Sequence, residues 1–256
     1  MSTPGLTSRL TTRWTRAALG FLFPGRCLLC DTPQEDFSPS RRFCDPCAQG
    51  LQSHVGENQC ARCGEPLGPH LKPEDFCPGC REEKFAFDRV IRWGVYEGHL
   101  QSACLLGKER AGERLITALA DCSCGNLSNG LLEQPIDLIM PVPHYWTHRF
   151  THGSGSSEIL ARAWAHRLKT PCATRLLKKI RWTPRQVGLT RAQRKENLRG
   201  AFAISRPRKI AGKRILLVDD VLTTGSTAHH ASKALRKAGA TQVIVAVLAR
   251  SRYSRT

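Results

Sequence analysis

The chain has 256 residues, of which 41% are hydrophobic and 23% are charged, so it can form one α/β domain with a sizeable core plus a smaller module. No run of 18 apolar residues occurs, and we therefore expect no membrane-spanning helix. The net charge of +18 is uneven: residues 140–256 hold 24 Lys and Arg against 4 Asp and Glu, whereas residues 1–139 hold 15 against 17. This surplus favours a polyanionic partner of the C-terminal half; solubility and attraction of one small polyphosphate form the alternative.

The first 24 residues are basic and partly apolar. Arg9, Arg13 and Arg16 precede a short apolar run over 17–23. A signal peptide is disfavoured because the run is short, ends at Pro24 and lacks a small-x-small cleavage site. We predict an amphipathic segment over 1–24 that docks onto the rest of the protein or onto a membrane surface.

Four Cys-x-x-Cys pairs follow within a stretch predicted to form a module over 25–84. Thirteen residues separate the first pair from the second and the third from the fourth, and the whole unit repeats with a period of 33. Two such pairs supply the four thiolates of a tetrahedral zinc site. We therefore predict a double zinc ribbon with two structural zinc ions. The predicted ligands are Cys27, Cys30, Cys44, Cys47, Cys60, Cys63, Cys77 and Cys80.

Other uses of these cysteines are less consistent with the pattern. Disulfides are disfavoured because no secretory signal accompanies them, and four pairs are too many for a catalytic dithiol. Equal spacing favours two sequential sites, although a cross-braced arrangement of the first pair with the third stays open. The remaining cysteines show no ligand spacing, and we expect them to be buried as small apolar residues. These are Cys104, Cys122, Cys124 and Cys172.

From residue 85 onward, apolar patterns typical of strands alternate with patterns typical of helices. This alternation predicts a parallel sheet with right-handed crossovers and flanking helices, in one α/β domain over 85–256. The predicted strands cover 90–96, 136–140, 215–218 and 242–248, and the predicted helices cover 99–121, 156–168 and 228–238.

The most informative stretch is ILLVDDVLTTGST, residues 215–227. A buried strand is followed at once by Asp219 and Asp220, and then by a small polar turn that opens a helix. Backbone N–H groups, hydroxyls and the helix N-terminus make such a turn a phosphate site. Carboxylates at that end of a strand suit sugar hydroxyls or a magnesium ion. The turn residues are Thr223, Thr224, Gly225, Ser226 and Thr227.

This stretch resembles the phosphoribosyl pyrophosphate (PRPP) binding motif of type I phosphoribosyltransferases. The resemblance covers all thirteen residues. It implies that Asp219 and Asp220 hold the ribose 2′- and 3′-hydroxyls and that residues 223–227 cradle the 5′-phosphate. It also implies magnesium as a cofactor that accompanies PRPP.

A wider resemblance appears in the order of the motifs. The zinc knuckles, the PVP of residues 141–143, RWTPRQVGLTRAQRKENLRGAF over 181–202 and the acidic motif together are similar to the ComF family of competence proteins. The resemblance implies a type I phosphoribosyltransferase fold with an N-terminal double zinc ribbon. It further implies a role in natural transformation, moving imported single-stranded DNA. The implied partners are PRPP, single-stranded DNA and the uptake machinery, at a cytoplasmic location peripheral to the inner membrane.

The chain departs from the family after the PVP strand. The family has an RGFNQ-like sequence there, whereas this chain reads RFTHGSGS over 149–156. The resemblance places the pyrophosphate loop at Val142, Pro143 and His144. Residues 153–155 still offer backbone N–H groups to phosphate, but loss of the Asn-Gln pair leaves turnover of PRPP open.

The segment 175–214 has 14 Lys and Arg, against Glu196 alone among acids. Basic residues beside an aromatic side chain suit single-stranded nucleic acid, which needs phosphate neutralisation and base stacking. A hood over the PRPP pocket, with arginines holding pyrophosphate, is the alternative. The predicted nucleic-acid residues are Arg181, Trp182, Arg185, Arg191, Arg194, Lys195 and Arg199.

Three functional hypotheses follow. The first is a PRPP-binding, phosphoribosyltransferase-like protein that handles single-stranded DNA during uptake. The second is an authentic magnesium-dependent transferase acting on an unidentified base or other acceptor. The third is a zinc-ribbon nucleic-acid binder whose α/β domain is a non-catalytic scaffold, and the intact acidic pair counts against it.

Overall fold

The computed structural model describes residues 25–34, 42–53, 55, 58–68, 70–72, 76–82, 84–109, 112–131, 135–143, 155–183 and 197–252. The predicted amphipathic segment over 1–24 lies outside the described residues. In chain order the elements are β1 (Gly25–Arg26), β2 (Pro33–Gln34), α2 (Asp45–Gln52), α3 (Pro78–Glu82), β3 (Arg89–Val95), α4 (Gly98–Leu106), α5 (Glu113–Leu131), β4 (Leu138–Pro141), α7 (Ser156–Arg167), β5 (Leu177–Lys179), β6 (Phe202–Ile204), the 3-10 helix η2 (Pro207–Lys209), β7 (Arg214–Leu222), α9 (Ser226–Lys237) and β8 (Gln242–Arg250).

A four-stranded parallel sheet in the order β3-β8-β7-β4 forms the centre of the molecule. Its strands read as continuous apolar runs because helices or the ribbon β5–β6 cover both faces. Residues Leu216 and Val218 of β7 face one layer, and Ile215 and Leu217 face the other. The predicted parallel α/β sheet is therefore confirmed.

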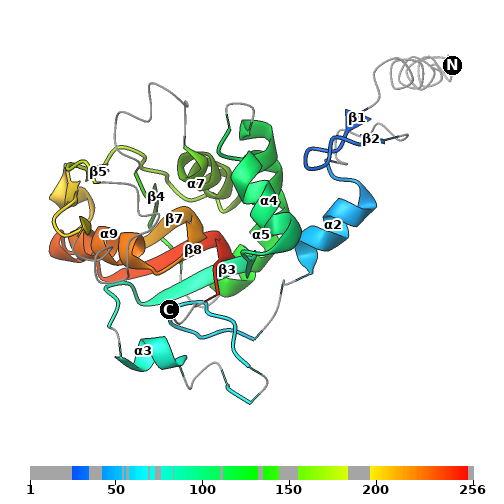
Figure 1. Ribbon diagram of the computed structural model, residues 1–256. Helices are drawn as coiled ribbons and strands as arrows, with labels where there is room; N and C mark the ends of the chain where they lie inside the picture. Colours follow the sequence, from blue (N-terminus) through cyan, green and yellow to red (C-terminus); the bar gives the residue numbers. More distant parts are fainter. Residues whose placement is uncertain are drawn as a thin grey trace, which may run out of the picture.

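The two faces carry different layers, as Figure 1 shows. Helices α4, α5 and α7 cover one face, and Trp164 of α7 is fully buried there, its indole N–H donating to the Ala120 carbonyl at 3.1 Å. Helix α9 and the antiparallel ribbon β5–β6 cover the other face. Both layers leave the carboxyl ends of β4 and β7 side by side at one edge of the sheet.

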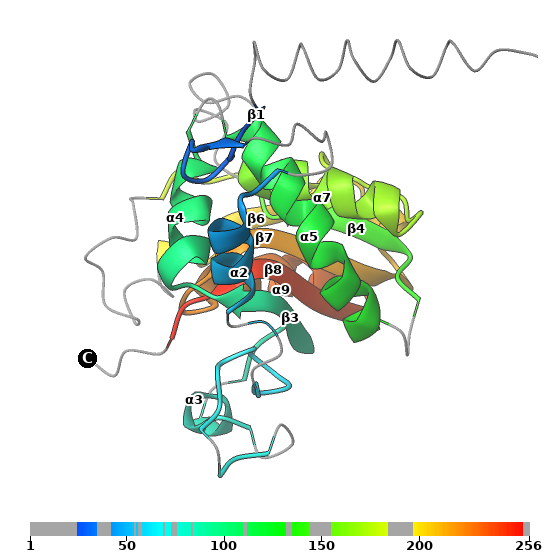
Figure 2. The same cartoon turned by 90° about the vertical axis from the view of Figure 1, so that its right-hand side faces the viewer.

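The two cysteine-rich units lie on different sides of the sheet domain (Figure 2). The first unit, with β1, β2 and α2, packs against α4, and its Cys47 and Leu51 join the core beneath α4 and α5. The second unit, with α3, lies beside the edge strand β3. There Arg92 donates its Nε–H to the Gln59 side-chain oxygen at 2.8 Å. The second unit thus covers an edge that would otherwise expose unpaired backbone groups.

The predicted helix over 99–121 is wrong in its extent, because the structure has two helices, α4 and α5, in its place. Gly107 ends α4, and a Cβ there would lie 2.3 Å from Cδ1 of Ile116. A Cβ on Gly112 would lie 2.4 Å from the Gly107 carbonyl oxygen. The two glycines thus permit a turn too tight for any larger residue, and the helical pattern is interrupted there.

The predicted burial of the four remaining cysteines holds for one of them. Cys104 of α4 is buried, Cys124 is half-buried, and Cys122 and Cys172 are exposed. On α5 the buried positions include Leu119, Ala120, Ser123 and Leu127, and Cys122 lies outside this buried set.

Candidate functional site: an acidic pair beside a hydroxyl-lined turn

The acidic pair lies inside β7 rather than after it, since the strand runs to Leu222. Asp219 and Asp220 are 8% and 6% exposed, and strand alternation sends their side chains to opposite faces of the sheet. Asp219 faces the α9 layer, and Asp220 faces the α4–α5 layer. One oxygen of each carboxylate accepts a backbone N–H of the next residue, at 3.0 Å and 2.7 Å. The second oxygen of Asp220, Oδ2, is buried and accepts no hydrogen bond from the described residues, although an ammonium group lies 3.5 Å away.

Burial makes Asp219 a weaker acid than an exposed aspartate. Burial, reinforced by the neighbouring charge of Asp220, raises the pKa of Asp219 well above its ordinary range, and Lys108 offsets only part of this effect. A nearby cation or a set of hydroxyl donors favours the ionised form of a buried carboxylate. Such a group bound beside Asp219 would therefore favour its ionised form.

Lys108 is a site residue to which the sequence analysis gave no role. It lies in the turn after α4, and its Nζ is 3.5 Å from Oδ2 of Asp220. Burial lowers the pKa of Lys108, but Asp220, Tyr96 and Asp219 raise it by more, so the net shift is upward. A lysine within an apparently regular helix pattern gives no local sequence signal of a site residue. Its position at the site is seen only in the structure, where the turn between α4 and α5 lies beside the end of β7.

The hydroxyl-rich turn begins directly after β7. Gly225 has φ 77°, in the left-handed region, and is the residue that precedes the first turn of α9. A Cβ at Gly225 would lie 3.1 Å from the Phe85 ring. Both the positive φ and this close approach therefore favour glycine at this position. The Thr224 and Ser226 hydroxyl oxygens are 3.0 Å apart. These groups and the N-terminus of a three-turn helix lie where the sequence predicts a phosphate site, and their phosphate role stays a prediction.

The predicted pyrophosphate loop starts at the neighbouring strand. Val142 follows β4, and its N–H donates to the Val218 carbonyl at 2.8 Å, which places it beside the acidic pair. Its own carbonyl accepts the Ser157 hydroxyl at 2.8 Å, a support that sequence reasoning missed. Pro143 is the last described residue of this stretch, and His144 lies outside the described residues. The pyrophosphate role of these residues stays a prediction.

The eight knuckle cysteines form two tetrads, one from the first and second pairs and one from the third and fourth. This is the sequential arrangement. Within each tetrad the sulfur atoms lie within 4.8 Å of one another, and all eight residues are free thiols. The Cys44 N–H points to the Cys27 sulfur at 3.4 Å, and the Cys77 N–H to the Cys60 sulfur at 3.3 Å. Four thiolates supported by backbone N–H groups fit a structural zinc ion in each tetrad.

The predicted nucleic-acid residues fall into two groups. Arg185, Arg191, Arg194 and Lys195 lie outside the described residues. Trp182 is 60% exposed, as a stacking platform requires.

The Arg181 guanidinium donates to the carbonyls of Asn197 and Arg199, both at 2.8 Å. Arg181 therefore holds the backbone near residues 197–199 with guanidinium N–H groups that would otherwise be available to bind a phosphate. The nucleic-acid role of the whole set stays a prediction.

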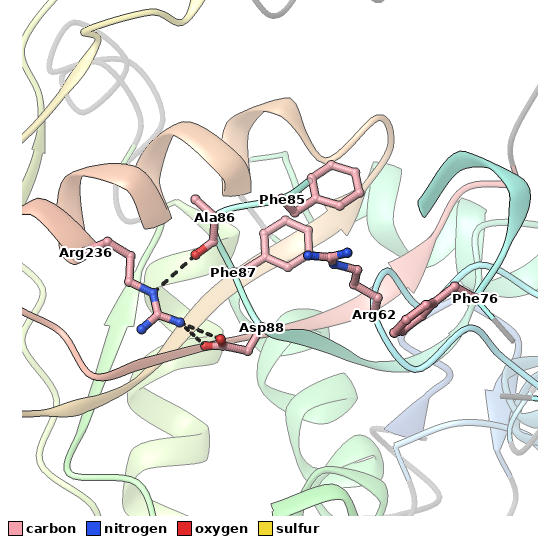
Figure 3. Close-up of a pocket in the computed structure, with 7 residues that line it drawn as sticks. All are labelled: Arg62, Phe76, Phe85, Ala86, Phe87, Asp88 and Arg236. Carbon is pink, nitrogen blue, oxygen red and sulfur yellow. Dashed lines mark hydrogen bonds and ion pairs between the residues drawn. The ribbon is translucent and has the colours of Figure 1, made fainter. Parts of the chain in front are cut away.

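A separate pocket of about 560 Å³ lies between the second cysteine unit and the start of β3 (Figure 3). The Arg62 guanidinium lies 5.8 Å from the centre of the Phe76 ring, and Phe85 stacks on Phe87 at 4.6 Å. Arg236 closes one end by pairing with Asp88. Neither the acidic pair nor the hydroxyl turn lines this pocket.

Comparison with known proteins agrees with this architecture. One family model, a double zinc ribbon domain, matches residues 18–81, and another, a phosphoribosyl transferase domain, matches residues 155–256. Competence protein F of Haemophilus influenzae is 28% identical over 218 residues, which cover 82% of this chain and 90% of that protein. The chain is thus similar to competence protein F over most of both proteins.

Proteins with another name align over an even larger part of the chain. The DNA utilization protein YhgH of Salmonella typhi is 29% identical over 234 residues, which cover 89% of this chain and 98% of that protein. The Escherichia coli K12 protein of the same name is 26% identical over 233 residues, with the same coverage. The resemblance drawn from the motifs, with its zinc ribbon and its phosphoribosyltransferase fold, is therefore confirmed.

Solved structures provide only general fold neighbours. Glutamine PRPP amidotransferase from B. subtilis aligns with TM-score 0.38 and 22% identity over 56% of this chain and 30% of that chain. Purine phosphoribosyltransferase from Pyrococcus horikoshii aligns with TM-score 0.36 and 21% identity over 54% of this chain and 77% of that chain. These scores are too low to carry an argument, so the fold assignment rests on the sheet, the cysteine tetrads and the family matches.

Proposed function

We propose that the chain binds PRPP at the carboxyl ends of β4 and β7 and handles single-stranded DNA in natural transformation. One observation carries the first half: a buried acidic pair ends the same strand that leads into a hydroxyl-lined helix N-terminus. A ribose 5-phosphate needs both features, a phosphate cradle and hydrogen-bond acceptors for its hydroxyls, a few ångströms apart.

Each group has a defined task in this proposal. The turn over 223–227 takes the 5′-phosphate with backbone N–H groups and hydroxyls. Asp219 and Asp220 accept the ribose hydroxyls. Lys108 lowers the repulsion between these carboxylates and the phosphates, because its ammonium group already lies at Asp220.

Magnesium fits the same donors. The Asp220 oxygen that is buried without a hydrogen bond is a hard acceptor of the kind that magnesium prefers. Asp219 and Asp220 would hold the ion, directly or through water, and the ion would neutralise the pyrophosphate charge. The two zinc ions are structural, since each tetrad supplies four thiolates and leaves no open position.

The DNA half of the proposal draws on other observations. Relatives named competence protein F and DNA utilization protein cover most of the chain. The basic surplus falls in the half with the phosphate site, and Trp182 is exposed within it. We place the protein in the cytoplasm, next to the uptake machinery at the inner membrane. Among the described residues, no helix is both long and apolar enough to cross a membrane.

Calorimetric titration with PRPP, with and without magnesium, tests the site. Asp219→Asn combined with Asp220→Asn should remove PRPP binding and leave the fold intact, because amide groups are similar in size to the carboxylates but carry no charge. Glu97→Gln, which breaks a surface ion pair with Arg252, is the control and should bind PRPP as the wild type does. Unchanged PRPP affinity in the double variant would show that the pair is not the ribose site.

An authentic phosphoribosyltransferase is the second candidate. The strongly raised pKa of Asp219 favours it, since perturbed acids of this kind cluster at catalytic sites. A pyrophosphate-release assay over candidate bases separates the two candidates. Release that depends on one base and disappears in the double variant would establish turnover.

A further inference from the structure

Arg250, the last residue of β8, holds an unusual position. Its side chain is 2% exposed, and a buried guanidinium is stable only when its N–H donors find acceptors. Its Nη2 pairs with the Glu65 carboxylate at 3.0 Å, and its Nε donates to the Cys63 carbonyl at 3.1 Å. Its Nη1 donates to the Leu222 carbonyl at 3.1 Å and also to the carbonyl of Thr223.

These partners belong to two distant parts of the chain. Cys63 and Glu65 form the knuckle of the second cysteine tetrad, and Cys63 lies 187 residues from Arg250. Leu222 and Thr223 are where β7 passes into the phosphate turn. The planar guanidinium group of Arg250 therefore connects the backbone of the second zinc knuckle with the backbone at the start of the turn over 223–227.

Phe85 provides a second connection between the same two parts. Its ring packs against the second tetrad on one side and lies close to Gly225 on the other. The next residue, Ala86, donates its N–H to Nδ1 of His229 in the first turn of α9, at 3.1 Å. Figure 3 shows Phe85 and Ala86 on the strand of chain that runs alongside α9.

The shape of this knuckle depends on its metal. The knuckle is a tight turn in which the Cys60 carbonyl accepts the Gly64 N–H at 2.9 Å, and little apolar core supports it beyond the four cysteines, Leu67 and Phe85. Such a unit obtains most of its folding energy from zinc. The first tetrad differs, because its unit packs against α4 on another side of the molecule.

We propose that the second zinc ribbon fixes the conformation of the phosphate turn through Arg250 and Phe85, so that zinc in the second tetrad strengthens phosphate binding at the turn while zinc in the first tetrad does not. Only the choice of PRPP as the phosphate ligand rests on the proposed function. Linkage is reciprocal, so bound PRPP also raises the zinc affinity of the second tetrad by the same factor.

The test compares Cys77→Ser with Cys44→Ser in the full chain. Each variant should keep one zinc ion of the two, measured by elemental analysis. Hydrogen exchange of the amides over 223–227 should accelerate about tenfold in Cys77→Ser and stay at the wild-type rate in Cys44→Ser. PRPP affinity should follow the same pattern, with a loss of about tenfold in Cys77→Ser alone. Equal effects of the two substitutions would overturn the proposal.

A second pair of variants separates the connection from metal loss. Arg250→Gln combined with Glu65→Gln removes the buried charges together and leaves all eight cysteines, so it should retain two zinc ions. We expect it to show the faster exchange over 223–227 all the same, whereas the neighbouring surface variant Arg252→Gln should not. A double variant with wild-type exchange would show that Arg250 does not transmit the effect.

The hydrogen-exchange measurement tests the coupling between the second ribbon and the turn independently of whether PRPP is the ligand. If the wild type fails to bind PRPP, the proposed function fails, and the exchange data still decide whether the second ribbon holds the turn. If PRPP binds and both cysteine variants bind it equally well, the coupling is wrong and the PRPP site stands.

Discussion

At the scale of single residues, the main finding is that a lysine and an aspartate from different layers meet at the site. Lys108 pairs with Asp220, while Asp219 lies on the opposite face of β7 in a setting that raises its pKa. The acidic pair is thus asymmetric: Asp220 forms an ion pair with Lys108, whereas Asp219 is buried and its pKa is raised. The two acids therefore differ in what they contribute to binding.

Replacing Lys108 by methionine should weaken PRPP binding most when magnesium is absent. The ammonium group is half-exposed, so its interaction with Asp220 is worth only about 1 kcal/mol, equivalent to about a fivefold loss of affinity. Magnesium should restore most of this loss, because it neutralises the same carboxylates. Titrations with and without magnesium measure the difference, with Lys233→Met, an exposed lysine on α9, as control. Equal losses with and without magnesium would contradict this role.

Asp219 should make stability and binding depend on pH in opposite directions. Its pKa is raised in the folded protein, so the folded state holds a proton that the unfolded chain has released. Stability therefore falls as pH rises from the ordinary pKa of an aspartate to the raised one, whereas PRPP binding, which needs the ionised acid, strengthens. Asp219→Asn should raise the melting temperature at neutral pH and remove this pH dependence. Thermal unfolding of the wild type and of Asp219→Asn across that pH window measures the difference. The same pH dependence of the melting temperature in both proteins would refute the assignment.

At the scale of elements, the strand-turn-helix unit from β7 to α9 contains the proposed phosphate site. Its conformation depends on one glycine with positive φ and on the ring packed against it.

Gly225→Ala should destabilise the protein by about 1 kcal/mol or more, because an L-residue is strained at this φ and its Cβ would press on Phe85. Phosphate binding should weaken as well. Gly125→Ala is the matched control: Gly125 lies in α5 with open space around it, and alanine there should stabilise by about 0.5–1 kcal/mol. Denaturant unfolding of both variants measures the contrast. Similar effects of the two alanines would show that the turn is not conformationally restricted.

The basic segment between β5 and β6 should contribute to DNA binding. Replacing Arg191, Arg194 and Lys195 with alanine should lower the slope of log affinity against log salt by about two, since each phosphate contact adds about 0.7 for single strands. Trp182→Ala should cost about 1–3 kcal/mol with little change in slope, because stacking releases no counterions. Fluorescence titration of a labelled oligonucleotide at several salt concentrations measures both. A triple variant that loses PRPP affinity and keeps its DNA affinity would identify the segment as a hood over the pocket.

The elements differ in how far the sequence could predict them. The apolar strands and the paired cysteine knuckles each depend on neighbours within a few residues, and these predictions are confirmed. The turn after β7 has the expected backbone form, and its phosphate role stays a prediction. The break between α4 and α5 was missed because it comes from close packing of two glycines against Ile116 and each other. Lys108 and Arg250 were missed because their partners lie far away in the sequence, where no local pattern reports them.

At the scale of the whole molecule, the cysteine-rich units and the sheet share their cores. Cys47 and Leu51 of the first unit join the hydrophobic cluster that includes α4 and α5. The buried side chains of Arg92 and Arg250 donate hydrogen bonds to groups of the second unit. The expected boundaries at 24/25 and 84/85 stay predictions. These contacts indicate that a cut at the second boundary would damage the sheet domain.

A chain that begins at residue 85 should therefore aggregate or lose cooperative unfolding. It would expose the edge strand β3 and leave the Arg250 guanidinium buried without Glu65 or the Cys63 carbonyl. A chain that begins at residue 25 should keep the wild-type transition. Light scattering and calorimetry of both compare them. A monodisperse, cooperatively folding fragment over 85–256 would show that the sheet domain is independent of the ribbons.

The strand order also determines when the protein can fold during synthesis. The last strand, β8, lies between β3 and β7, so β3 waits for a partner that leaves the ribosome some 150 residues later, on the order of ten seconds at ordinary rates. The cysteine knuckles are complete long before then and can take up zinc at once. Metal loading therefore precedes closure of the sheet, and the nascent chain carries folded zinc ribbons beside an open strand edge until β8 emerges.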